Sequence, residues 1–147
     1  MKTINLIAVL IAMVIPLTSH ADAAKEAIAI SMVKSQIELF KTNQPDAISN
    51  INTKKQSNSK THAILVYDFN GKIVAWSFLP TLVGRPAFGL SNSDGPLPVN
   101  ESITKAAQGK SGWYEISMKN PATGLIGKIK VYYEPINNLV VTSGFFE

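Results

Sequence analysis

The sequence predicts an α+β domain in which a long amphipathic helix packs on a five-stranded antiparallel sheet. Three observations lead to this prediction. Apolar residues recur at helical spacing near the N-terminus, five runs rich in β-branched and aromatic residues follow, and most of these runs are joined by short turns. Short turns favour antiparallel pairing, because parallel strands need long crossover connections. The long helix is then the natural cover for one face of the sheet.

Residues 1–23 have the layout of a secretory signal peptide. Lys2 gives a basic start, an apolar run extends over Ile4–Leu17, and small residues follow it as far as Ala23. The run is shorter than the ~20 residues that a helix needs to cross a bilayer. We therefore expect export to the periplasm, with cleavage after Ala21 or Ala23. Retention of this segment as a membrane anchor is the alternative.

Residues 24–147 are sufficient for one domain with a single hydrophobic core. The chain has no cysteine, so apolar burial must hold the fold without disulfides. A formal charge of +4 without a dense tract of lysine and arginine predicts no nucleic-acid partner. At most, this charge favours small anions.

Two helices are expected before the first strand. Within residues 24–42 the apolar positions recur at spacings of four, four and three, which is typical of an amphipathic helix. These positions are Ala29, Val33, Ile37 and Phe40. Pro45 disfavours helical geometry in the residue before it, so the first helix should end there. A short second helix is expected over Asp46–Ile51, and the polar residues 53–60 are interpreted as an exposed loop.

A β-hairpin is predicted next, over Thr61–Asp68 and Lys72–Phe78. Asn70-Gly71 between the two strands tolerates the positive φ angles that tight hairpin turns require. Leu79–Pro98 then holds four prolines and three glycines in a loop too long to be a simple connection. Loops of this length in a compact domain are usually functional or disordered.

A short helix is expected over Asn100–Gln108, capped by Asn100 and ended at Gly109. Three closing strands are expected over Gly112–Met118, Leu125–Tyr133 and Leu139–Phe146. If the long helix covers one face of the sheet, the long loop and the short helix are left to cover the other. A sheet covered by a loop can enclose a cavity, and such cavities are common small-molecule sites.

Seven short motifs follow one another along the chain. They are Leu65–Trp76, Leu82–Arg85, Asp94-Gly95, Ser111–Trp113, Asn120–Gly124, Lys130–Tyr133 and Ser143–Phe146. Together they resemble a single Cache domain, the extracytoplasmic sensor module of bacterial chemoreceptors and sensor kinases, which also occurs as free-standing periplasmic proteins. The resemblance extends from the N-terminal helix to the last residue. It implies a PAS-like fold, a ligand pocket under the long loop, and binding of a small organic acid such as acetate, propionate or pyruvate.

The chain departs from the pattern of this family at three positions. Trp76 stands where relatives often carry histidine, Asn92 where they carry an acidic residue, and Ile116 where they carry tyrosine. These departures indicate an altered pocket, so the ligand of a relative does not transfer directly to this chain.

Seven side chains are candidates for the ligand pocket, and we assign each a role by its chemistry. They are Trp76, Arg85, Phe88, Trp113, Lys130, Tyr132 and Tyr133. Arginine and lysine would meet the negative charge, the former through two parallel hydrogen bonds to a carboxylate. One tyrosine would donate its hydroxyl: Tyr132 shares a strand face with Lys130, whereas Tyr133 matches the tyrosine of the family.

The tryptophans and Phe88 would enclose the apolar part of the ligand. Each of these assignments has a structural alternative. Arg85 is equally suited to a solvent-facing loop, Lys130 to a strand whose aliphatic stem lies along apolar neighbours, and a tryptophan to the core.

We expect a periplasmic domain that binds a short organic acid without catalysis or cofactor, and that either passes its bound state to a partner such as a membrane sensor protein or acts as a binding protein. His62 is the only histidine after residue 23, and no nucleophile motif, metal-spaced set or phosphate loop is found. A hydrolase would need Glu115 or Glu134 beside another carboxylate in a cleft. The main alternative is a pocketless interaction module that contacts a membrane sensor or forms a homodimer through the N-terminal helix.

Overall fold

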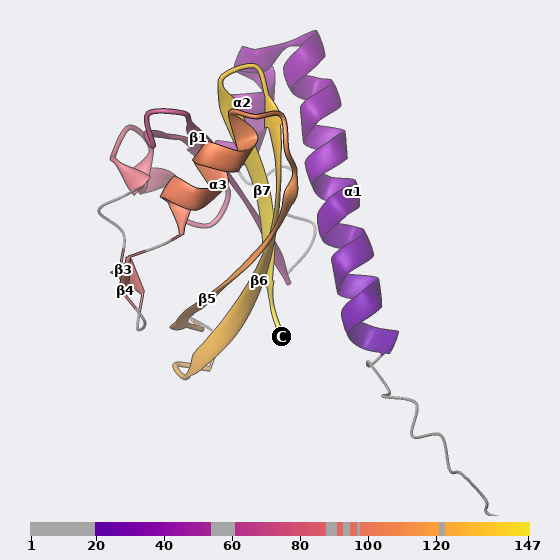
Figure 1. Cartoon of the computed structure of the whole chain (residues 1–147), viewed down its shortest axis with the longest axis vertical. Helices are drawn as coiled ribbons and strands as arrows, with labels where there is room; N and C mark the ends of the chain where they lie inside the picture. Colours follow the sequence, from indigo (N-terminus) through magenta and orange to yellow (C-terminus); the bar gives the residue numbers. More distant parts are fainter. Residues whose placement is uncertain (1–19, 54–60, 88–90, 93–94, 97, 121–122) are drawn as a thin grey trace, which may run out of the picture.

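The computed structural model of the chain describes residues 20–53, 61–87, 91–92, 95–96, 98–120 and 123–147 (Figure 1). The elements in chain order are α1 (His20–Thr42), α2 (Gln44–Asn52), β1 (His62–Asp68), β2 (Ile73–Trp76), the 3-10 turn η1 (Pro80–Leu82), β3 (Ser91–Asn92), β4 (Gly95–Pro96), α3 (Val99–Ala106), β5 (Gly112–Lys119), β6 (Ile126–Ile136) and β7 (Leu139–Phe146).

Five strands form one antiparallel sheet in the order β2-β1-β7-β6-β5. The helix α1 lies along one face of this sheet, and α3 lies on the other together with the segment that follows β2 (Figure 1). The predicted α+β architecture is therefore confirmed. The short strands β3 and β4 pair with each other within the predicted long loop.

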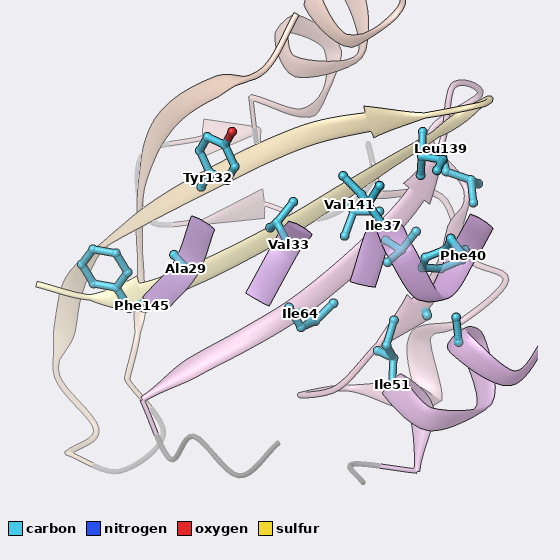
Figure 2. Close-up of a cluster of buried hydrophobic side chains, with 14 residues drawn as sticks. Ala29, Val33, Ile37, Phe40, Ile51, Ile64, Tyr132, Leu139, Val141 and Phe145 are labelled. Atoms are coloured by element: carbon cyan, nitrogen blue, oxygen red, sulfur yellow. The ribbon is translucent and has the colours of Figure 1, made fainter. Parts of the chain in front are cut away.

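The core between α1 and the sheet is built from the predicted apolar stripe (Figure 2). Ala29 and Val33 are fully buried, and they pack with Ile64 of β1 and with Val141 and Phe145 of β7. Burial of such side chains is the main contribution that holds a helix on a sheet. The spacing in the sequence thus identified the buried face of α1 correctly.

The helix α1 begins earlier than predicted, at His20, and its first turn is rich in alanine, the strongest helix former. It includes Ala21 and Ala23, so cleavage after either residue stays a prediction. Among the described helices, none combines the length and the apolar composition needed to cross a membrane.

A new helix, α2, begins directly after Asn43. The Asn43 side chain accepts a hydrogen bond from the backbone N–H of Asp46, and Pro45 lies in the first turn, where no backbone donor is required. The helix α2 buries Ala47 and Ile51 next to β2.

The β1–β2 hairpin turn has the geometry expected from its sequence. Gly71 has φ +77°, and the Asp68 carboxylate accepts hydrogen bonds from the backbone N–H groups of Asn70 and Lys72, each at 2.9 Å. Strand β2 ends at Trp76, shorter than expected, because the Ile64 N–H bonds the Ser77 hydroxyl at 2.9 Å instead of the Ser77 carbonyl, and the chain then turns into η1.

The helix α3 ends as predicted but does not begin as predicted. Gly109 has φ +75°, and the N–H groups of Gly109 and Lys110 bond the carbonyls of Ala106 and Lys105, a regular C-terminal cap. At the other end the cap position is Pro98, which supplies no side-chain hydrogen bond, and Asn100 lies inside the helix. The prediction of an Asn100 cap is therefore wrong.

Candidate functional site

Three tyrosines from three strands meet on the α3 face of the sheet. Tyr67 of β1 is fully buried, Tyr133 of β6 is 3 % exposed, and Tyr114 of edge strand β5 is half-buried. Alternation along the strands places all three on the same side, and the rings of Tyr114 and Tyr133 lie 6.1 Å apart. We call these residues, together with Ser102 of α3, the tyrosine cluster.

Hydrogen bonds anchor Tyr67 of the tyrosine cluster to α3. The Ser102 hydroxyl donates to the Val99 carbonyl at 2.8 Å, so its oxygen is left to accept from the Tyr67 hydroxyl at 2.7 Å. Tyr114 of the edge strand β5 lies in the same cluster and packs on Tyr133. The cluster therefore gathers side chains from β1, β5 and β6 beneath the helix α3.

Tyr67 and Tyr114 stay protonated well above neutral pH. Burial raises the pKa of Tyr67 to about 12, and burial together with the neighbouring Tyr67 raises the pKa of Tyr114 well above its ordinary value. Their hydroxyls are thus neutral hydrogen-bond donors. Such donors can bind a carboxylate or another polar group without introducing a buried charge of their own.

A hollow of about 10 Å³, partly open to solvent, adjoins the cluster. Its lining residues are Pro98, Glu101, Ser102, Lys105, Trp113, Tyr114 and Tyr133. A hollow of this size has room for about one water molecule, so an organic acid would enter only if the surrounding side chains moved apart. Lys105 is the cation at its rim, and its Nζ lies 2.6 Å from Glu101, whose hydrogen bond raises the pKa of Lys105.

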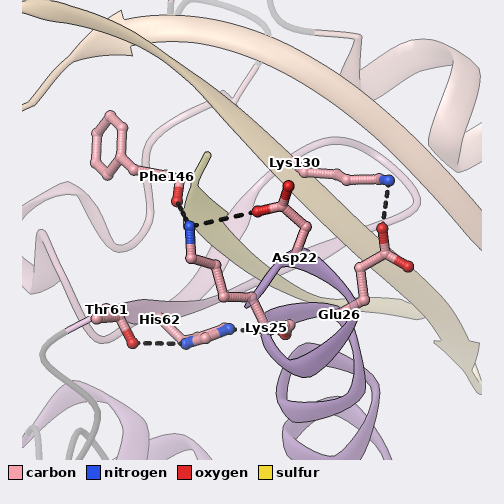
Figure 3. Close-up of polar contacts among 7 residues, drawn as sticks. All are labelled: Asp22, Lys25, Glu26, Thr61, His62, Lys130 and Phe146. Atoms are coloured by element: carbon pink, nitrogen blue, oxygen red, sulfur yellow. Dashed lines mark hydrogen bonds and ion pairs between the residues drawn. The ribbon is translucent and has the colours of Figure 1, made fainter. Parts of the chain in front are cut away.

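Three of the predicted site residues lie on the opposite face, under α1. Lys130 donates to the Glu26 carboxylate at 2.5 Å and lies 5.3 Å above the Trp113 ring (Figure 3). That ring packs at 5.1 Å from the ring of Tyr132, whose hydroxyl donates to Glu134. The hydrogen bond to Glu26 also raises the pKa of Lys130.

The remaining predicted residues are divided between the α3-side core and the surface. Trp76 is buried on the same face as Tyr133. The side chain of Arg85 is exposed. The backbone of Arg85 holds the turn after η1 through hydrogen bonds to Leu82 and Ile73. Phe88 lies outside the described residues. The structure thus does not bring Lys130 and Tyr133 together, and one pocket beneath α3 cannot contain all the predicted residues.

The sequence analysis missed Tyr67, Ser102 and Tyr114. A signal for Tyr114 was present, because it follows Trp113 on one strand and must face the opposite side. For Tyr67 and Ser102 no such signal exists, since their contact joins residues 35 positions apart.

His62, the only histidine that the sequence analysis considered for catalysis, lies on the α1 side (Figure 3). Its Nε2 donates to the Lys25 carbonyl at 2.9 Å, its Nδ1 accepts from Thr61 at 2.9 Å, and its ring packs on Phe145. Within the described ranges no three residues of the types His, Cys, Asp or Glu gather closely enough to hold a metal ion.

The arrangement of α1, the sheet and α3 has counterparts among solved structures, although no protein-family model and no curated protein matches the chain. A methyl-accepting chemotaxis protein from Vibrio parahaemolyticus superposes with a TM-score of 0.70 at 16 % identity, covering 86 % of this chain and 90 % of that one. A periplasmic sensor domain of a chemotaxis protein gives 0.71 at 16 % identity, covering 87 % and 99 %.

A third structure is described as a Cache chemosensory domain that recognises carboxylic acids. It gives a TM-score of 0.68 at 18 % identity and covers 87 % of this chain and 98 % of that one. This chain has the fold of a single Cache domain. The Cache fold therefore confirms the resemblance carried by the seven sequence motifs, and it places the tyrosine cluster on the face of the sheet opposite the long N-terminal helix.

Proposed function

We propose that this chain is a periplasmic sensing domain that binds a short organic acid at the tyrosine cluster. The observation that carries the proposal is the group of neutral tyrosine hydroxyls beside the small hollow under α3, which would have to open to admit the acid. The Cache fold supports it, as does the structural neighbour described as recognising carboxylic acids. The signal-peptide pattern of residues 1–23 supports export.

The ligand carboxylate would accept hydrogen bonds from the hydroxyls of Tyr114 and Tyr133 and from Lys105, since the Tyr67 hydroxyl already donates to Ser102. Lys105 is now paired with Glu101 one helical turn away, and both side chains are exposed. Exposed ion pairs stabilise only weakly, so exchanging Glu101 for a ligand carboxylate costs little. The aromatic ring of Tyr133 at the same hollow would contact the short hydrocarbon part of the acid.

We infer binding without chemistry. The two ring nitrogens of His62 are engaged by Lys25 and Thr61 on the far side of the sheet. Glu115 is paired with Lys128, and Glu134 accepts from Tyr132. The acid/base pair that a hydrolase would need is therefore not formed by these carboxylates. A bound state would be relayed to a membrane sensor protein.

Calorimetric titration with acetate, propionate and pyruvate tests the proposal. Binding of at least one acid is expected, with affinity reduced by roughly tenfold or more in Tyr114→Phe and Lys105→Gln, since charge-assisted hydrogen bonds contribute about 1.5–3 kcal/mol. Lys130→Gln is the matched control, because it removes a lysine from the α1 face, and it should bind normally.

Two results would contradict this proposal in different ways. Loss of binding in Lys130→Gln but not in Lys105→Gln would move the site to the α1 face. No binding of any short acid would favour the pocketless interaction module, which the small size of the hollow also favours. In that case sedimentation analysis of the chain alone would distinguish a homodimer from a subunit of a membrane sensor.

A further inference from the structure

The turn between β5 and β6 exposes two large aliphatic side chains. Leu125 is 70 % and Ile126 is 61 % exposed, the highest values among the large apolar side chains that the structure describes. Lys119, whose Cα is paired with that of Ile126, and Lys128 flank them, and both lysines are exposed. We call these four residues the β5–β6 tip.

The tip lies at the same end of the molecule as the beginning of α1 and the end of β7 (Figure 1). Polar contacts hold this end together: Lys25 Nζ donates to the Phe146 carbonyl at 3.0 Å (Figure 3), and the Glu147 N–H donates to the Lys128 carbonyl at 3.1 Å. In the sequence, the apolar run Ile4–Leu17 ends just before α1 begins at His20. The tip and the point where this run joins the domain therefore face the same way.

We propose that the β5–β6 tip docks on an anionic lipid bilayer. Aliphatic side chains enter the boundary between headgroups and acyl chains, while lysines beside them are attracted by anionic headgroups. This combination of two aliphatic residues between two lysines matches that surface. When the tip is docked, the first turn of α1 faces the membrane. The tyrosine cluster stays accessible from the aqueous side.

A second copy of the chain is a less suitable occupant of the tip. In a symmetric dimer the same patch meets itself, so Lys119 and Lys128 of one copy would approach the same lysines of the other. Among the residues that the structure describes, only Lys128 of these two lysines has a nearby carboxylate, Glu115 at 4.0 Å, and that pair is exposed. The like charges therefore oppose self-association and favour a negatively charged lipid surface.

The absence of cysteine from the sequence permits a direct test with a single label. Leu125→Cys carries an environment-sensitive fluorophore in the full-length chain, and Asn138→Cys, exposed in the β6–β7 turn, is the matched control. Each is measured with vesicles of phosphatidylcholine alone and with added phosphatidylglycerol. Because both positions are exposed turn residues, neither label disturbs the core.

The expected result is a shift of emission to shorter wavelength and a several-fold rise in intensity for the label at position 125. This change should appear with phosphatidylglycerol vesicles, weaken at high salt, and be absent at position 138. If the chain sediments with the vesicles while the label at 125 stays in water, the proposal is overturned. A concentration-dependent shift without vesicles would also overturn it, by assigning the tip to a second copy.

Discussion

The hydroxyl oxygens of Tyr67 and Ser102 lie 2.7 Å apart and join strand β1 to helix α3. Both side chains are buried, with Tyr67 fully enclosed and Ser102 2 % exposed. Buried hydroxyls must be hydrogen-bonded, because an unpaired one loses its solvation without compensation. This contact therefore fixes the position of α3 over the sheet and, with it, the shape of the adjacent hollow.

Tyr67→Phe should destabilise the protein by roughly 2 kcal/mol. The variant removes the buried bond to Ser102 and leaves the Ser102 oxygen without its donor, and an unsatisfied buried polar group costs about 1–3 kcal/mol. Urea unfolding at neutral pH measures the loss as a shift in midpoint at constant slope. Tyr132→Phe is the control, since its partly buried bond to Glu134 should contribute less; equal losses in the two variants would refute the argument.

Stability should fall at high pH because of Tyr67. In the unfolded chain this tyrosine ionises near ~10, whereas in the fold its pKa is raised to about 12. Between these values the unfolded state releases the proton first, so the stabilisation is complete below pH ~10 and is lost as the pH rises toward the folded pKa. Unfolding free energies measured from pH 8 to 11 should decline less steeply in Tyr67→Phe than in the wild type.

Stability should also fall in mild acid because of His62. Burial is the main cause that lowers the pKa of His62. The hydrogen bond to the Lys25 carbonyl raises this pKa in part, and the nearby charge of Lys25 lowers it further. Below pH ~6.5 the unfolded chain binds a proton more readily than the fold does. The contribution of His62 is therefore present above that pH and lost as the pH falls through the folded pKa. An NMR titration should place the ring pKa below 6.5, and His62→Gln should flatten the decline in unfolding free energy between pH 7 and 5.

The ion pair between Lys130 and Glu26 should contribute modestly to the docking of α1. The two side chains are 28 % and 35 % exposed, so solvent screens part of their attraction. A double-mutant cycle with Lys130→Gln and Glu26→Gln should give a coupling of about 0.5–1 kcal/mol. Lys41→Gln with Glu38→Gln, a more exposed pair within α1, is the matched cycle and should give less. A larger coupling energy for Lys41 and Glu38 than for Lys130 and Glu26 would show that burial does not determine the strength of these ion pairs.

Periodic patterns in the sequence were sufficient to predict the main elements of the fold. The buried face of α1 follows from the spacing of Val33 and Ile37, because a helix has one fixed period. The first hairpin follows from Asn70-Gly71, because few residues accept the φ of +77° found at Gly71. The prediction of an Asn100 cap was wrong because a local capping rule allows several possible first residues, and the cap position of α3 is Pro98, two residues earlier.

The candidate site was less predictable because it depends on which face of the sheet each strand presents to α1. Alternation shows that Lys130 and Tyr132 share a face, but the sequence does not say that this face is covered by α1. That depends on contacts such as the one between Lys130 and Glu26, 104 residues apart. For the same reason Tyr67 and Ser102 could not be paired before the fold was known.

The strand order has a consequence for biogenesis. Strand β7 is the last of the five strands along the sequence, yet it lies between β1 and β6 in the middle of the sheet. Until Leu139–Phe146 emerge from the ribosome, β1 and β6 have no common neighbour, and pairing between distant segments is slow to form. The sheet therefore cannot close until its final strand has been made.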